Sequence, residues 1–417
     1  MTSLAPISSN TTRSTTAHDA VTELPGLGKV ATQQFAGYAS ITGDAYPKTR
    51  SGYAESLFYW FVGADDYANK PTIIWSNGGP GSSSFWGFFL ENGPYHIESA
   101  SEPKLTERPH AWNQHANYLI FEHPLSVMLS FAKSAKDLPQ TPEEGAQQYY
   151  QALQNFLSLH PEVAKNPIIL AGESYAGTYL PLLAREIKRG NKHEHNIQIN
   201  LKSMVLMDAW VEPYAQMSMD TEYAYSHGMI SRREKQKLDK EYKHNYPALN
   251  AAIQSICGLY MTNIAELADP PFQPIMDYLN RKDVRAALHI HSDIPLTESW
   301  SAAIANNYQA DVNKSVRKLV NKLIDQGLQT IVISGLNDAK DCNFMGTEKW
   351  LHKLKGHHAE TFKDAATQPW RLSAQSPVLG YVQGDQTLTW LKVLNAGHMA
   401  AMDQPNIINW LKDRIGF

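Results

Sequence analysis

The chain has 417 residues, of which 43% are hydrophobic, and its 37 basic and 41 acidic side chains give a formal net charge of −4. This length and apolar content suffice to bury a sizeable core. The near balance of charge, without a long basic run, argues against nucleic-acid or anionic-membrane binding, and no apolar stretch reaches the length of a membrane span. Two cysteines, Cys257 and Cys342, allow at most one disulfide and stand at no metal-ligand spacing, so no metal site is predicted.

The first twenty residues are rich in serine and threonine and are expected to form a disordered tail, which leaves residues 21–417 as one ordered domain. The N-terminus lacks the charged and apolar regions of a signal peptide, so a cytoplasmic protein is expected if the sequence is complete. Aromatic and β-branched runs at 34–41 and 56–62 predict two strands that begin a sheet in antiparallel fashion.

Further along the chain, buried strands alternate with helical patterns such as residues 143–160. The strands are predicted at residues 71–76, 118–122, 166–171, 199–207, 328–334 and 388–394. This alternation indicates an α/β fold with a central, mostly parallel sheet flanked by helices. Residues 214–274 are polar and helical without any sheet signal, which predicts an inserted helical cap.

The strand at 166–171 runs into Gly172-Glu173-Ser174-Tyr175-Ala176-Gly177, and a helical pattern follows. A serine between two glycines at a strand-to-helix junction is the pattern of a nucleophile elbow, in which the sharp turn exposes the hydroxyl and backbone amides face a forming oxyanion. The strand at 71–76 runs into a loop of three glycines and three serines, residues 77–84. That loop lacks the lysine and the spacing of nucleotide-binding loops, and in a serine hydrolase it would supply the second oxyanion amide.

Two later strands end in the partners that a nucleophilic serine needs. Asp338 follows the strand at 328–334, and His398 follows the strand at 388–394. An imidazole takes the proton of the serine hydroxyl, and a carboxylate fixes the imidazole tautomer and stabilises its cation. The chain order Ser174, Asp338, His398 is that of α/β hydrolases, so the sequence predicts this catalytic triad on an α/β-hydrolase fold.

Several further motifs accompany the serine motif: Leu24-Pro25-Gly26, Leu57-Phe58-Tyr59-Trp60-Phe61, Trp75 with Asn77-Gly78-Gly79-Pro80-Gly81, Glu91-Asn92-Gly93-Pro94, Trp112-Asn113, Tyr278-Leu279-Asn280 with Val284, and Ala396-Gly397-His398-Met399 with Asp403-Gln404-Pro405. Together these motifs resemble one family, the serine carboxypeptidases, and the resemblance runs from about Leu24 to the C-terminus. The resemblance implies peptide C-termini as substrates, no cofactor, and a secreted or acidic compartment, in contrast to the cytoplasmic reading of the N-terminus.

The resemblance also assigns residue roles. The backbone amides of Gly79 and Tyr175 would form the oxyanion hole. Binding of the free C-terminal carboxylate would fall to a second set of residues, namely Asn77, Gly78, Glu91 and Glu173. Two glutamates facing a third carboxylate raise the pKa of at least one of them, and the protonated form can donate a hydrogen bond to the substrate. Substrate affinity is therefore expected to fall as the pH rises.

The chain departs from the family pattern at several points. Ser82 replaces a cysteine that is often disulfide-bonded, Met207-Asp208 replaces a Gly-Asn pair, and two glycines of the loop 122–130 are replaced by larger side chains. The stretch after Asp338 looks one residue long, which makes Asp341 the alternative acid. The region between Met207 and Tyr278 looks short for the family's cap.

The main hypothesis is a serine carboxypeptidase that releases C-terminal amino acids through an acyl-enzyme on Ser174. The first alternative is a serine carboxypeptidase-like acyltransferase or a specialised small-molecule hydrolase, in keeping with the altered loop and short cap. The second is a non-catalytic binding protein on the same fold, against which the intact triad argues. Four apolar side chains are candidate pocket walls: Trp86, Phe88, Phe89 and Met128.

Overall fold

The computed structural model describes residues 18–417 except 43–54, 98–103, 244, 259–260 and 340–341. Most of the predicted tail, residues 1–17, and the alternative acid Asp341 thus lie outside the described residues. Within the described chain, no helix has both the length and the apolar character needed to cross a membrane.

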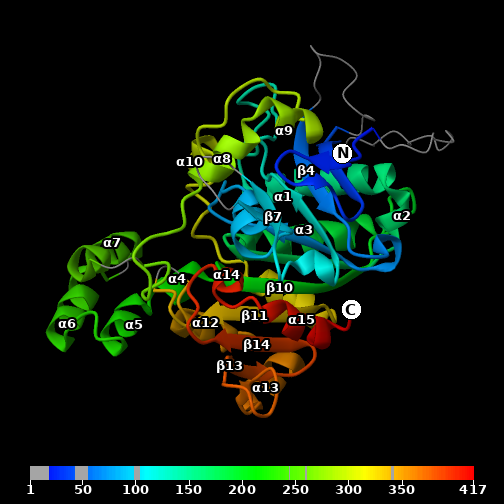
Figure 1. The fold of residues 1–417 in the computed structure, drawn as a ribbon. Coiled ribbons are helices and arrows are strands. Elements are labelled where there is room, and N and C mark those ends of the chain that lie inside the picture. Colours follow the sequence, from blue (N-terminus) through cyan, green and yellow to red (C-terminus); the bar gives the residue numbers. More distant parts are fainter. Residues whose placement is uncertain (1–17, 43–54, 98–103, 244, 259–260, 340–341) are drawn as a thin grey trace.

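The largest element is a ten-stranded mixed sheet (Figure 1). Its strands are β3 (Gln34–Ser40), β4 (Ser56–Val62), β5 (Thr72–Ser76), β8 (Asn117–Phe121), β9 (Ile168–Ser174), β10 (Leu201–Ala209), β11 (Gln329–Gly335), β12 (Gln368–Trp370), β13 (Gly380–Gly384) and β14 (Leu388–Val393). The strand order is β12-β13-β14-β11-β10-β9-β5-β8-β4-β3, with parallel pairing from β14 to β8 and antiparallel strands at both edges. The predicted mostly parallel sheet with an antiparallel start is confirmed.

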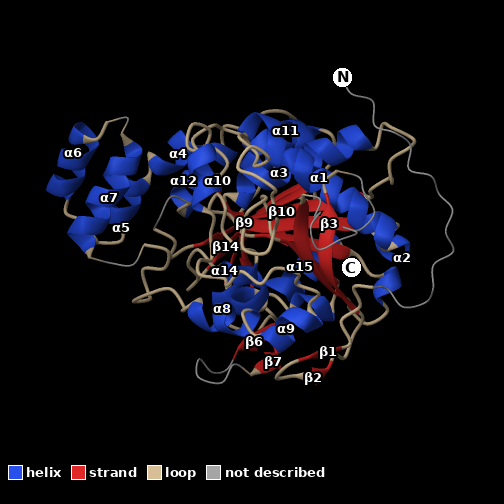
Figure 2. Ribbon diagram, turned by 90° about the horizontal axis from the view of Figure 1, so that it is seen from above, coloured by secondary structure: helices blue, strands red, loops and turns tan. Residues whose placement is uncertain are grey.

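Helices cover both faces of this sheet (Figure 2). The core of one face includes side chains from α1 (Pro142–Leu159), α3 (Ala176–Gly190), α4 (Pro213–Met217), α10 (Ala302–Asn307), α11 (Arg317–Asp325), α12 (Phe344–Leu351) and α13 (His357–Asp364). The core of the other includes side chains from the single π-turn η2 (Gly87–Glu91), α8 (Gln273–Leu279), α9 (Lys282–Ala287), α14 (Ala400–Asp403) and α15 (Ile407–Ile415). Neighbouring residues of β4 alternate between the cores, since Tyr59 joins the first and Trp60 the second.

Apart from three helices described below, the other elements are short. They are the hairpin of β1 (Glu23–Leu24) and β2 (Gly28–Lys29), the pair β6 (Tyr95–Ile97) and β7 (Leu105–Glu107), the helix α2 (Pro161–Ala164), and the 3₁₀ turns η1 (Tyr67–Asn69) and η3 (Trp112–Gln114). The edge strand β12 and its neighbour β13 were not predicted, because β12 contains a proline and β13 is bounded by glycines, and both residue types are depleted in strands.

The described chain begins at residue 18, before the predicted tail boundary at residue 20. Asp19 is buried, and its carboxylate lies 2.8 Å from His160 Nε2. Burial alone would raise the pKa of Asp19, but the hydrogen bond and charge attraction from His160 outweigh it, so that the pKa is lowered. This contact with the end of α1 anchors the N-terminal segment, and a Ser/Thr-rich composition gives no sign of it.

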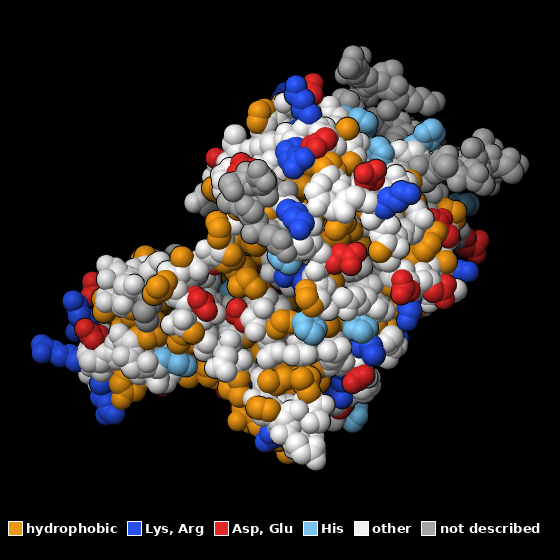
Figure 3. All heavy atoms as spheres, in the orientation of Figure 1, with side chains coloured by type: hydrophobic (Ala, Val, Ile, Leu, Met, Phe, Trp, Pro, Cys, Tyr) orange, Lys and Arg blue, Asp and Glu red, His pale blue; other side chains and the backbone are white. Residues whose placement is uncertain are grey.

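Three helices project from the body as an arm, which we define as α5 (Asp220–Ser226), α6 (Arg232–Glu241) and α7 (Tyr246–Cys257) (Figure 1). They share a small apolar cluster of their own that includes Tyr223, Leu238 and Ile253. Figure 3 shows Lys and Arg side chains gathered at the tip of the arm, where α6 is almost entirely exposed. The predicted insertion at 214–274 thus carries helices, and its role as a cap stays a prediction.

Candidate active site

Ser174 ends strand β9 and turns the chain into helix α3. Its φ of 59° lies in the left-handed region, a strained conformation for a non-glycine residue and the expected backbone of a nucleophile elbow. The flanking glycines leave no space for a side chain, since a Cβ on Gly172 would lie 2.3 Å from Ser76 O and one on Gly177 would lie 2.6 Å from Trp210 N. Close packing around the turn therefore requires glycine at both positions.

The glycine loop after β5 packs directly against this elbow. A Cβ on Gly78 would lie 2.2 Å from Tyr175 N and 2.8 Å from Ser174 Cβ, so only glycine fits there. Gly79, Tyr175 and Ser174 line one cavity of about 90 Å³ together with His398. The predicted nucleophile, base and oxyanion residues thus border the same space.

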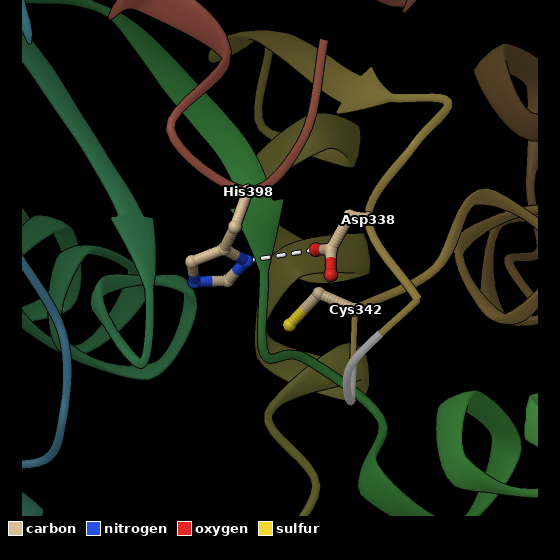
Figure 4. Close-up of side chains that lie close together, drawn as sticks. All are labelled: Asp338, Cys342 and His398. Carbon is tan, nitrogen blue, oxygen red and sulfur yellow. Dashed lines mark hydrogen bonds and ion pairs between the residues drawn. The ribbon is translucent and has the colours of Figure 1, made fainter. Parts of the chain in front are cut away.

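Asp338 and His398 come together from the loops after β11 and β14 (Figure 4). Asp338 Oδ2 accepts a hydrogen bond from His398 Nδ1 at 2.7 Å, with the carboxylate fully buried. Because Nδ1 bonds to the carboxylate, Nε2 is the ring nitrogen that can act as the base. Cys342 lies beside the pair, and ligand atoms of the three residues fall within 4.8 Å of one another. A metal ion there would have to displace the bond between Asp338 and His398.

A short segment after the arm holds both triad loops. Within residues 261–264, Met261 O accepts from Ala339 N at 2.9 Å, Ile264 N donates to Asn337 O at 3.1 Å, and Thr262 O accepts from His398 N at 2.7 Å. The segment therefore joins the acid loop to the histidine loop by backbone hydrogen bonds. We refer to residues 261–264 as the clamp segment; nothing in its sequence pattern indicated this role.

The predicted carboxylate-binding residues form a buried cluster. Asn77 Oδ1 accepts from Trp75 Nε1 at 2.8 Å and from Gly87 N at 2.9 Å. Because these two donors occupy the amide oxygen, the amide nitrogen is turned toward the glutamates. It donates to Glu173 Oε1 at 2.7 Å and to Glu91 Oε1 at 3.2 Å. The cluster lies next to the nucleophile in the chain, because Glu173 directly precedes Ser174.

Both glutamates hold their protons more tightly than usual. Burial raises the pKa of Glu91 to about 6, partly offset by a hydrogen bond with Glu173 and by Asn77. Burial, with repulsion from Glu91, raises the pKa of Glu173 well above its usual value. In the described chain, no N–H or O–H group donates to the buried Oε2 atom of either glutamate. A proton shared between the two carboxyl groups would give both oxygens a hydrogen-bond partner. The pair can therefore donate a hydrogen bond near neutral pH.

The altered loop after β8 supports the glycine loop. Glu122 is fully buried, its Oε1 accepts from Ser84 N at 2.8 Å, and burial raises its pKa to about 8. Ser126 and Met128, which stand where the family usually has glycines, have φ of 70° and 37°. Both adopt the left-handed backbone that favours glycine, and therefore carry strain.

Asp208, at the end of β10, is a further buried acid beside the triad. Its two carboxyl oxygens lie 3.0 and 3.2 Å from the amide of Gly335. Burial and repulsion from Asp338 raise its pKa well above the usual value. The sequence marked this position only as a departure from the family pattern.

The candidate pocket walls do not gather around Ser174. Phe88 and Phe89 are buried in the apolar core, and Trp86 packs on Phe272 with ring centroids 4.7 Å apart. Met128 lines a larger cavity of about 320 Å³, which includes none of the predicted catalytic or carboxylate-binding residues. The smaller cavity beside Ser174 is bounded instead by side chains that were not predicted to line it, among them Trp210 and Val312.

Comparison with known proteins places these observations in a family. The model of the serine carboxypeptidase family matches residues 25–266 and 259–412. The chain is 28% identical to serine carboxypeptidase-like 48 of Arabidopsis thaliana, over 93% of this chain and 80% of that protein. It is also 28% identical to the pheromone-processing carboxypeptidase KEX1 of Phytophthora infestans, over 93% of this chain and 70% of that protein.

The fold has a counterpart among solved structures. The prohormone-processing carboxypeptidase Kex1 of Saccharomyces cerevisiae superposes with a TM-score of 0.80 at 22% identity, over 95% of each chain. That likeness establishes the α/β-hydrolase fold expected from the strand order and the serine motif. Because the family model matches most of this chain, the chain belongs to the serine carboxypeptidase family.

Proposed function

We propose that the protein is a serine carboxypeptidase in which Ser174 is the nucleophile, His398 the general base and Asp338 the group that orients it. The observation that carries the proposal is the joining of two features: a cavity bordered by Ser174 and His398, and a buried cluster of Asn77 and two glutamates one residue from the nucleophile. The first feature supports acyl transfer, and the second supports recognition of a free C-terminus.

In this mechanism His398 Nε2 takes the proton of the Ser174 hydroxyl as the oxygen attacks the last peptide carbonyl. The negative charge on the tetrahedral carbonyl oxygen is stabilised by the amides of Gly79 and Tyr175. The C–N bond then breaks, and His398 gives its proton to the departing amino acid. Water repeats the sequence on the acyl-enzyme and releases the shortened peptide.

The carboxylate cluster accounts for cleavage at the last bond alone. Asn77 Nδ2, the amide of Gly78 and a protonated glutamate of the pair Glu91 and Glu173 would donate hydrogen bonds to the terminal carboxylate. A chain that continues beyond this point has no charge to match them, and its extra residues would meet the buried cluster. Binding of the terminus thus places the adjacent carbonyl at Ser174.

Mass spectrometry of N-terminally blocked peptides with free-acid or amidated C-termini tests the proposal. We expect stepwise loss of C-terminal residues from the free acids only, and no loss with Ser174→Ala. A fluorophosphonate probe reports separately whether Ser174 is reactive. If Ser174 reacts with the probe but no peptide is shortened, the carboxypeptidase proposal is wrong and acyl transfer to another acceptor becomes the better hypothesis.

A further inference from the structure

The cavity beside Ser174 is small. It is lined by Gly79, Ser174, Tyr175, Trp210, Val312, Cys342 and His398 and has a volume of about 90 Å³, compared with about 320 Å³ for the larger cavity elsewhere. An apolar cavity of roughly 150 Å³ holds one benzene ring, so a cavity of about 90 Å³ has room for fewer atoms than that ring. Any substrate group that enters it must be compact.

The lining shows which side of the scissile bond the cavity serves. None of Asn77, Glu91 or Glu173, which would hold the terminal carboxylate of the departing residue, lines the cavity. Trp210 and Cys342 follow β10 and β11, which lie on the other side of β9 from β5, the strand that leads into Asn77. Val312 follows α10. Given the proposed function, the cavity receives the residue on the acyl side, which becomes attached to Ser174.

Trp210 is fixed at both ends. Its backbone amide donates to Ser174 O at 2.7 Å, and its carbonyl accepts from Thr178 Oγ1 at 3.0 Å. Its indole Nε1 donates to the carbonyl of Val312 at 2.7 Å, and the residue is 7% exposed. The ring is thereby tied to the next wall of the same cavity. Moving it aside would break this partly buried hydrogen bond, which opposes a movement that would admit a larger group.

We propose that Trp210 restricts the acyl-side residue to small side chains, so that the enzyme removes C-terminal residues that follow glycine, alanine or serine. This inference rests on the proposed function and names its substrate class. A space of about 90 Å³ admits a methyl or hydroxymethyl group. It is smaller than the roughly 150 Å³ that accommodates one benzene ring, so it excludes the seven-carbon side chain of phenylalanine.

The test is a panel of blocked dipeptides that share one C-terminal residue and vary in the acyl residue: glycine, alanine, serine, valine, leucine and phenylalanine. We expect kcat/KM for alanine to exceed that for phenylalanine by about 100-fold or more, since a misfitting group costs several factors of ten in the transition state. Equal or better turnover of phenylalanine overturns the inference.

Substitution at Trp210 then assigns the cause. Trp210→Leu is expected to raise the ratio of kcat/KM for phenylalanine to kcat/KM for alanine at least tenfold. Val312→Ala widens the same cavity from the other wall and serves if the first variant does not fold. Trp410 is a half-buried tryptophan on α15 that packs near Trp370 and lines neither cavity. Trp410→Leu is therefore the matched control and is expected to leave the preference for the acyl residue unchanged. An unchanged preference in both cavity variants refutes the role of these walls.

Short esters separate this inference from the proposed function. p-Nitrophenyl acetate, butyrate and octanoate have no terminal carboxylate, so they report on the cavity even if the protein is not a carboxypeptidase. We expect acetate to be cleaved faster than octanoate, and Trp210→Leu to shift the preference toward longer chains. If octanoate is cleaved as well as acetate, the cavity does not select by size, whatever happens with peptides.

Discussion

The buried pair Glu91 and Glu173 predicts a pH dependence of substrate binding. The C-terminal carboxylate of a peptide stays ionised above pH 5, so its own titration adds nothing. Below pH 6 Glu91 carries a proton, because burial raises its pKa to about 6. Above that pH, Glu91 must take up a proton for the site to receive a third negative group without repulsion. Affinity should therefore be flat below pH 6 and fall above it.

The expected size follows from the uptake of one proton. Each pH unit well above the pKa weakens binding by about tenfold. Because Glu91 is half protonated at pH 6, the Kd at pH 8 should be about 50-fold higher than at pH 6. Calorimetry with the Ser174→Ala variant measures Kd without turnover. A peptide amide in the same protein serves as the control, since it lacks the carboxylate but senses any titration of His398.

Glu91→Gln removes the titrating group near pH 6 while keeping a side chain that can donate a hydrogen bond. Its Kd should vary less than about threefold between pH 6 and 8. A wild-type Kd that does not change between pH 5 and 8 would refute the reasoning, and so would a Glu91→Gln variant that keeps the full slope.

Two further predictions concern buried acids outside the pair. Since burial raises the pKa of Glu122 to about 8, the folded chain keeps a proton that the unfolded chain releases above pH 4.5, and stability should fall by up to about 1.4 kcal/mol per pH unit between these values. Urea unfolding of Glu122→Gln at pH 5, 6.5 and 8 should show that slope reduced relative to wild type; parallel curves would contradict it. Asp208 is expected to be neutral, because burial and Asp338 raise its pKa, so Asp208→Asn should leave the acid limb of the kcat/KM profile within about 0.3 pH unit of wild type. A downward shift near one unit would mean that Asp208 carries a charge.

The catalytic loops could be anticipated because parallel strands end at one edge of a sheet. Buried apolar runs mark the strands that lead to Ser174, Asp338 and His398, and each functional residue lies at the end of its strand or within five residues after it. Sequence order along the chain then suffices to expect convergence, without any knowledge of the strand order in space.

Features that depend on packing between distant segments could not be anticipated. Trp210 also follows a strand at that edge, which was a usable signal, but its hydrogen bond to Val312 joins segments 102 residues apart. The pairing of Asp19 with His160 spans 141 residues. In both cases the local composition is compatible with an ordinary loop or tail, and only the folded arrangement selects the partner.

The clamp segment has a consequence for the time at which activity arises. Thr262 O accepts from the backbone of His398, and Met261 and Ile264 bond to the loop that carries Asp338. These contacts close long stretches of chain, which makes them slow to form relative to local structure. A chain still being synthesised would already contain Ser174 and its elbow, but not the histidine loop that the clamp segment holds. A chain that stops before His398 therefore has no assembled triad, and hydrolytic activity becomes available only after the histidine loop has been made and has docked on the clamp segment.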